Sequence, residues 1–83
     1  MEDPIIMYER FEDTPFAGEL RETGYTVEGE HPVFVLNQER GFEASVLKMV
    51  DGNWLVYCPT EEDEGTHAVP DLDEVAKFIR RRL

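Results

Sequence analysis

Residues 43–58 read EASVLKMVDGNWLVYC, two runs rich in β-branched and aromatic residues on either side of Asp51-Gly52. Asp-Gly between such runs is a favoured two-residue type I′ loop, and it predicts a β-hairpin with strands at 43–50 and 53–58. The register that follows places three pairs on one apolar face, which we expect to meet the core: Met49 with Trp54, Leu47 with Val56, and Ser45 with Cys58. The other face is then expected to carry Val46, Lys48, Leu55 and Tyr57.

Two further strands are predicted upstream of this hairpin. Residues 32–38 contain the apolar run Val33 to Leu36, and residues 39–41 form a turn that leads back toward the hairpin. Tyr25 to Glu28 alternates apolar and polar residues between two glycines, which indicates a fourth strand. The sequence therefore predicts an antiparallel meander of three to four strands.

A C-terminal helix is predicted from about residue 71 to 82. Asp71 follows Pro70 as a helix N-cap, and Glu74 stands three residues on, as in a capping box. One helical face carries an apolar stripe of Leu72, Val75, Ala76, Ile79 and Leu83, which should cover the apolar face of the hairpin. Acids at the start and Arg80, Arg81 and Arg82 at the end complement the helix dipole.

The first 24 residues admit more than one interpretation. Asp3-Pro4 and Thr14-Pro15 both resemble helix starts with proline at the first helical position, and short helices are favoured. A strand over residues 5–8 and a hairpin over residues 16–27, turning at Thr23-Gly24, are the alternatives. The fold class is α+β, with the N-terminal region undecided.

Length and composition limit the class of protein to which the chain can belong. Eighty-three residues with 41% hydrophobic content predict one folded domain, residues 1–83. No run of about 18 apolar residues predicts a membrane span, and the acidic start Met1-Glu2-Asp3 is unlike a signal peptide. Cys58 is the only cysteine. A soluble, cytoplasmic protein is expected.

The chain carries 19 Asp and Glu against 8 Lys and Arg, a formal net charge of −11. The acids are concentrated in residues 1–32 and 61–83, on either side of a nearly neutral apolar middle. Such a charge repels nucleic acids and anionic membranes and attracts basic partners. We therefore expect neither direct nucleic-acid binding nor membrane binding.

No catalytic, nucleotide-binding or metal-binding motif is found, and we expect no enzyme activity, no cofactor and no metal site. Cys58 lies on the predicted core face in acidic surroundings, which favours packing over a nucleophilic role. His31 and His67 lack metal-ligand spacing, and the run Glu61 to Glu64 lacks the pattern of a calcium loop. That run is expected to be a solvated connection between the hairpin and the helix, or a recognition element.

The leading functional prediction is a non-enzymatic acidic inhibitor or regulator that occupies a basic face of a partner protein, including faces that normally hold nucleic acid. Carboxylates on a rigid scaffold replace phosphates in a basic groove. The candidate partner-binding residues are Glu61, Glu62, Asp63, Glu64, Glu28, Glu30, Glu19 and Glu22. In size, acidity and lack of motifs the chain resembles, as a class, small phage-encoded inhibitors of host defence nucleases, including anti-CRISPR proteins.

Two alternatives remain open at this stage. Acidity can serve solubility or adaptation to salt, in which case it says nothing about a partner. A small regulatory or homodimerising domain can instead bind through an apolar sheet face, with Phe34, Phe42, Leu55 and Tyr57 as the candidate patch. One helix covers only one face of a sheet, so the second face is left available.

Overall fold

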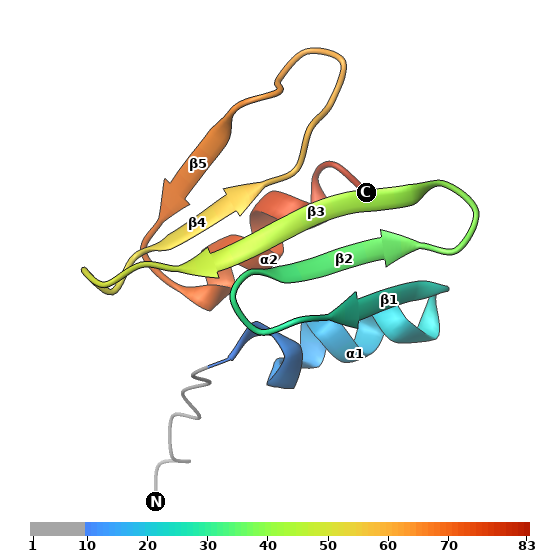
Figure 1. The fold of residues 1–83 in the computed structure, drawn as a ribbon, viewed down its shortest axis with the longest axis horizontal. Helices are drawn as coiled ribbons and strands as arrows, with labels where there is room; N and C mark the ends of the chain where they lie inside the picture. Colours follow the sequence, from blue (N-terminus) through green and yellow to red (C-terminus); the bar gives the residue numbers. More distant parts are fainter. Residues whose placement is uncertain (1–9) are drawn as a thin grey trace, which may run out of the picture.

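The structure is a computed structural model that describes residues 10–83. Five strands form one antiparallel sheet in sequence order (Figure 1): β1 (Tyr25–Glu28), β2 (Val33–Asn37), β3 (Gly41–Lys48), β4 (Trp54–Tyr57) and β5 (Thr66–Val69). A short 3₁₀ turn, η1 (Phe11–Asp13), and α1 (Pro15–Glu22) precede the sheet, and α2 (Leu72–Arg80) follows it. The predicted α+β class, meander and C-terminal helix are confirmed. The sheet has a fifth strand, β5, where the sequence predicted only a connection.

Both helices cover the same face of the sheet, behind the strands in the view of Figure 1. Phe16, Ala17 and Leu20 of α1 join Val75 and Ile79 of α2 in the buried core. The strands contribute the residues of one face: Val27, Val33, Val35, Ala44, Val46, Trp54 and Val56, with Cys58 just after β4. The fold therefore has two layers, and the helices leave the second sheet face uncovered.

The β3–β4 hairpin forms, but its predicted register is wrong by one residue. Lys48 opposes Trp54 and Val46 opposes Val56, because the loop has three residues, Val50 to Gly52. Met49 N–H donates to the Asn53 carbonyl (2.8 Å), and Gly52 N–H donates to the Met49 carbonyl (3.1 Å). Gly52 has φ +91°, as in a type I turn closed by a left-handed glycine.

This shift exchanges the two faces of β3, because side chains alternate along a strand. Ala44 and Val46 are buried, whereas Ser45 and Leu47 lie on the opposite face and Lys48 sits on the core side, where its Nζ lies 5.7 Å from the Trp54 ring. Predictions for β4 are unaffected by the slip. Trp54, Val56 and Cys58 are buried, as predicted.

The two remaining strand predictions are confirmed. β1 pairs with β2 from Tyr25 opposite Asn37 to Glu28 opposite Phe34, which places β1 at the sheet edge. The β2–β3 pairing shifts by one residue between Val35 and Leu36, a β-bulge. Beyond the bulge, Phe42 pairs with Leu36.

Each of the two helices begins at a side chain that caps a backbone N–H group of its first turn. Thr14 Oγ1 accepts from Ala17 N–H (3.3 Å) ahead of Pro15, so the helix start predicted there is confirmed and the alternative hairpin over residues 16–27 is wrong. Asp71 Oδ1 accepts from Glu74 N–H (2.9 Å) at the start of α2. Leu83 lies beyond the helix end and is 41% exposed, so it does not extend the buried stripe. The predicted helix start at Asp3-Pro4 and the alternative strand over residues 5–8 lie outside the described residues.

Candidate interaction surface

The uncovered face of the sheet, called the open face below, is largely apolar. Alternation along the strands places one set of residues there: Thr26 and Glu28 of β1, Phe34 and Leu36 of β2, Phe42, Ser45 and Leu47 of β3, Leu55 and Tyr57 of β4, and Thr66 and Ala68 of β5. Neither α1 nor α2 lies on this side, which faces the viewer in Figure 1. Phe34 and Phe42 remain 38% and 43% exposed.

Three aromatic rings cross the middle of the open face. The Phe34 and Phe42 rings meet edge to face, with centroids 6.3 Å apart, and the Phe42 and Tyr57 centroids are 5.9 Å apart. The bulge in the β2–β3 ladder sets this arrangement, because it brings Phe42 opposite Leu36. The rings therefore form a continuous apolar row across β2, β3 and β4, and such contiguous exposed apolar surface marks interaction sites.

Positive charge is absent from the open face within residues 10–83. Among the residues of β1 to β5 in the described part of the chain, Lys48 is the only Lys or Arg, and it lies on the core side. Glu28, opposite Phe34, places one carboxylate at the β1 edge of the open face. Elsewhere, five basic side chains already pair with carboxylates: Arg10 with Glu12, Arg40 with Glu43, Lys77 with Glu74, Arg80 with Glu19, and Arg82 with Asp63.

The structure separates the predicted partner-binding acids into three groups. Glu19 and Glu22 lie on α1, on the helix side of the sheet. Glu28 and Glu30 lie at the end of β1 and in the β1–β2 turn. The run Glu61 to Glu64 lies in the β4–β5 loop, at the other end of the strands and beside the opposite sheet edge in Figure 1.

Asp63 differs from its acidic neighbours because it holds the β4–β5 loop together. Its carboxylate accepts from Gly65 N–H (3.0 Å), His67 Nε2 (2.7 Å) and Arg82 Nη2 (2.9 Å). The Gly65 N–H and the two side chains hold the pKa of the Asp63 carboxyl below its ordinary value. Asp63 therefore links the loop to the end of α2, while Glu61, Glu62 and Glu64 are exposed.

The same contacts fix the position of the His67 side chain, which its neighbours in the sequence did not predict. Its ring packs against Phe78 of α2 (centroids 4.9 Å apart), and the Arg82 guanidinium lies 3.7 Å from the same Phe78 ring. Four residues separate Asp63 from His67, but 19 separate it from Arg82. Only the fold brings the Arg82 guanidinium to this carboxylate.

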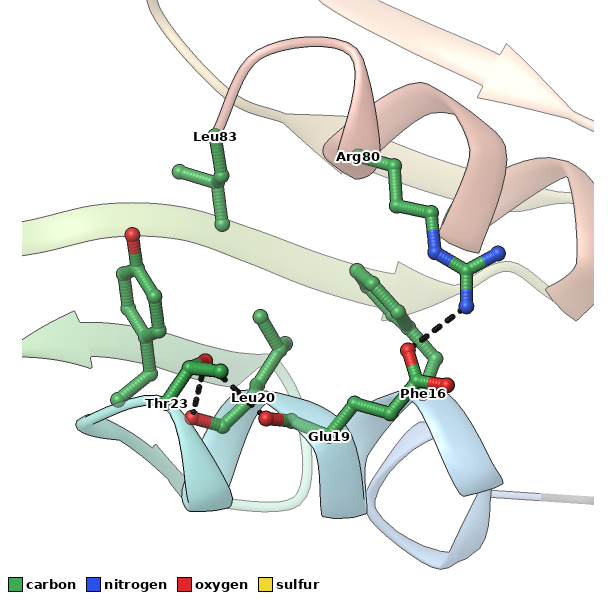
Figure 2. Close-up of a pocket in the computed structure, with 7 residues that line it drawn as sticks. Phe16, Glu19, Leu20, Thr23, Arg80 and Leu83 are labelled. Atoms are coloured by element: carbon green, nitrogen blue, oxygen red, sulfur yellow. Dashed lines mark hydrogen bonds and ion pairs between the residues drawn. The ribbon is translucent and has the colours of Figure 1, made fainter.

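A shallow groove lies between α1 and α2 on the helix side (Figure 2). The larger of the two cavities along this groove, of about 380 Å³, has Phe16, Leu20, Tyr25 and Leu83 among its lining residues. The Glu19–Arg80 ion pair (2.8 Å) spans the groove, and Arg80 also lies 4.9 Å from the Phe16 ring. The two charged side chains that line the larger cavity therefore satisfy one another.

Cys58 is buried, and burial raises the pKa of its thiol. A raised pKa keeps the sulfur protonated at neutral pH, which supports the packing role predicted for it. Within residues 10–83, no cluster of three or more His, Cys, Asp or Glu side chains is arranged to hold a metal ion. No helix in this part of the chain has the length and apolar character needed to cross a membrane.

Comparison with protein-family models found no match, and neither did comparisons with curated proteins and with solved structures. Function is therefore inferred from the geometry of the fold and its surfaces.

Proposed function

We propose that this chain is a non-enzymatic protein-binding domain, an inhibitor or regulator that covers a surface of a partner protein with its open face. The observation that carries the proposal is the aromatic row of Phe34, Phe42 and Tyr57. Two of these rings are more than a third exposed, although the same sheet buries its other face thoroughly. Aromatic side chains are enriched at the cores of protein interfaces, where a few anchor residues supply most of the binding energy.

The partner is proposed to be basic. Acids that form no ion pair within residues 10–83 lie at the β1–β2 turn and in the β4–β5 loop, and these charges attract a positive surface and speed encounter with it. In this arrangement the acids guide association. The apolar row stabilises the complex, because binding removes its surface from water.

Nucleic-acid mimicry is a second candidate, and the observation that favours it is the exposed acidic loop with Glu61, Glu62 and Glu64. On this alternative, the loop itself enters a basic groove and replaces phosphates. The three separated acidic groups support it less well than one continuous acidic face would.

The test is capture of partners from a lysate of the organism that encodes the chain, at about 0.1 M and 0.5 M salt. Three tagged proteins are compared: the unchanged chain, a Phe34→Ser/Phe42→Ser variant, and a Glu61→Gln/Glu62→Gln/Glu64→Gln variant. We expect the aromatic variant to lose the partner at both salt concentrations. The acidic-loop variant should keep it, with weaker capture only at low salt.

The opposite pattern would reject the open face as the binding surface. If the acidic-loop variant loses the partner, the aromatic variant keeps it, and added DNA displaces it, the loop is the contact and mimicry is the better account.

A further inference from the structure

We infer that the occupant of the open face is an amphipathic helix with lysine or arginine along both flanks, supplied by the partner protein. The inference rests on the proposed function and specifies the partner element that the open face receives.

The shape of the open face favours a helix. The row from Phe34 on β2 to Tyr57 on β4 spans two strand spacings, about 10 Å, which is close to the diameter of a helix. A sheet face offers no backbone hydrogen bonds, so the element that covers it must satisfy its own, as a helix does. The other face of this sheet is already covered in this way by α1 and α2.

Net charge favours a partner helix over a second copy of this chain as the occupant of the open face. Each chain has a formal net charge of −11, so two open faces brought together would unite two strongly acidic molecules. No base on the described part of the open face is available to offset that repulsion, and Glu28 adds a carboxylate at its edge. A helix with basic flanks meets no like charge on this face.

The apolar side of such a helix is expected to follow the ordinary helical spacing, with large apolar residues at i, i+3 or i+4, and i+7. These residues would pack between the rings of Phe34, Phe42 and Tyr57 and over Leu36, Leu47 and Leu55. A helix laid along the strands in this way would point its basic flanks toward the two edges of the sheet, where Glu28 of β1 and the acidic loop that leads into β5 lie.

The test uses three synthetic peptides of 18 residues and the complete chain. The first peptide has leucines on one helical face and lysines on its flanks. The second has the same composition in scrambled order, and the third has glutamate in place of lysine. Binding is measured by fluorescence anisotropy, and the contact is mapped by ¹⁵N chemical shifts. Phe42→Ser is compared with Leu83→Ser, a matched loss of an exposed apolar side chain on the helix side.

The Leu/Lys peptide should shift amides of β2, β3 and β4 and bind about tenfold more weakly to Phe42→Ser, the equivalent of about 1.4 kcal/mol. Leu83→Ser should bind it unchanged, the scrambled peptide should bind more weakly, and the glutamate peptide should not bind. Equal binding of the scrambled peptide, shifts confined to residues 61–64, or no binding of the Leu/Lys peptide would overturn the inference.

A second experiment measures the oligomeric state of the chain alone by sedimentation. A monomer at about 0.1 M and 0.5 M salt is expected. A dimer that Phe42→Ser dissociates would make a second copy the occupant and also overturn the inference. If the peptides fail while Phe34→Ser/Phe42→Ser still abolishes capture of the natural partner, the proposed function stands and only the helix is rejected. If that variant also keeps the partner, both are rejected.

Discussion

Asp63 is the residue whose replacement should most clearly separate structure from surface charge. Asp63→Asn removes the carboxylate that pairs with Arg82 and is hydrogen-bonded to His67, so thermal denaturation should show a lower midpoint than in the unchanged chain. Glu62→Gln, one position away and exposed, is the matched control and should leave the midpoint nearly unchanged. Equal midpoints for the two variants would show that the Asp63 contacts do not stabilise the fold.

The same carboxylate gives a pH dependence with a defined sign. The Asp63 pKa is lower in the folded chain than its ordinary value, so its ionised form stabilises the fold above that ordinary value. This contribution is lost as the pH falls from about 4 through the lower, folded pKa. Midpoints measured between pH 6 and pH 2 should fall less steeply in Asp63→Asn than in the unchanged chain. An identical slope would contradict the assignment.

Trp54 and Leu55 are neighbours in β4 that face opposite sides of the sheet. Trp54→Ala should cost about 3 to 5 kcal/mol of unfolding free energy, because the ring is buried beneath the helices. Leu55→Ala should cost about 1 kcal/mol, since this side chain is only half-buried on the open face. Urea denaturation measures both values. Similar losses at the two positions would mean that the open face is covered.

These residues show what the sequence could predict at this scale. Trp54 and Cys58 were placed correctly, because alternation along β4 is a local signal. Asp63 was grouped with Glu61, Glu62 and Glu64 because all four are acidic. Its structural role depends on Arg82, 19 residues away, and no local pattern reports that contact.

At the scale of single elements, α2 depends on its N-cap. Asp71→Ala removes the acceptor of the Glu74 N–H and should cost about 1 kcal/mol of unfolding free energy. Asp73→Ala is the matched control, since Asp73 is also acidic and in the first turn but is not the N-cap. Urea titration of the two variants gives the comparison. A larger loss in Asp73→Ala would mean that charge near the dipole outweighs the capping bond.

The β1–β2 turn should tolerate alanine poorly at Gly29. This residue has φ +90°, and a Cβ there would lie 2.7 Å from the Pro32 carbonyl oxygen. Gly29→Ala should therefore cost about 2 to 4 kcal/mol, from the left-handed backbone and the required shift of the turn. Gly24→Ala, at φ +96° with no atom within 4 Å of the added Cβ, should cost about 1 kcal/mol. Denaturant midpoints that do not separate the two variants would contradict the close approach.

Elements were predicted well where capping or alternation is local, as in α2, β1 and β2. The register of the β3–β4 hairpin was wrong because Asp51-Gly52 fits two loops. The same glycine completes either a two-residue turn or the three-residue loop that includes Val50. β5 was missed because Thr66 to Val69 is short and follows an acidic run, so its pairing with β4 decides its structure.

At the scale of the whole molecule, the sequence predicted that a sheet face would stay free and named four of its residues. Phe34, Phe42, Leu55 and Tyr57 do share the open face, despite the wrong register of the hairpin. The register error exchanged the faces of residues 44–48 of β3, while Phe34 on β2 and Tyr57 on β4 follow the alternation of their own strands. Phe42 of β3 lies on the open face because the bulge changes the alternation between it and Ala44. The row formed by their rings could not be predicted, because it depends on the bulge beside Leu36.

Net charge predicts how the stability of the whole chain responds to salt. Folding gathers a formal charge of −11 into a molecule with a Cα radius of gyration of 12.9 Å, so its carboxylates repel one another more than in the unfolded chain. Sodium chloride screens this repulsion, with a Debye length of about 10 Å at 0.1 M and about 3 Å at 1 M. The thermal midpoint should therefore rise up to about 0.3 M and then level off.

Removing three of the charges provides the control for this prediction. Glu61→Gln/Glu62→Gln/Glu64→Gln replaces exposed side chains that make no ion pair with another residue of the range 10–83, so the rise with salt should become smaller without loss of the fold. A midpoint that keeps climbing steeply into molar salt would instead support acidity as an adaptation to salt. Screening is nearly complete at that concentration, so repulsion between carboxylates could no longer explain a further increase.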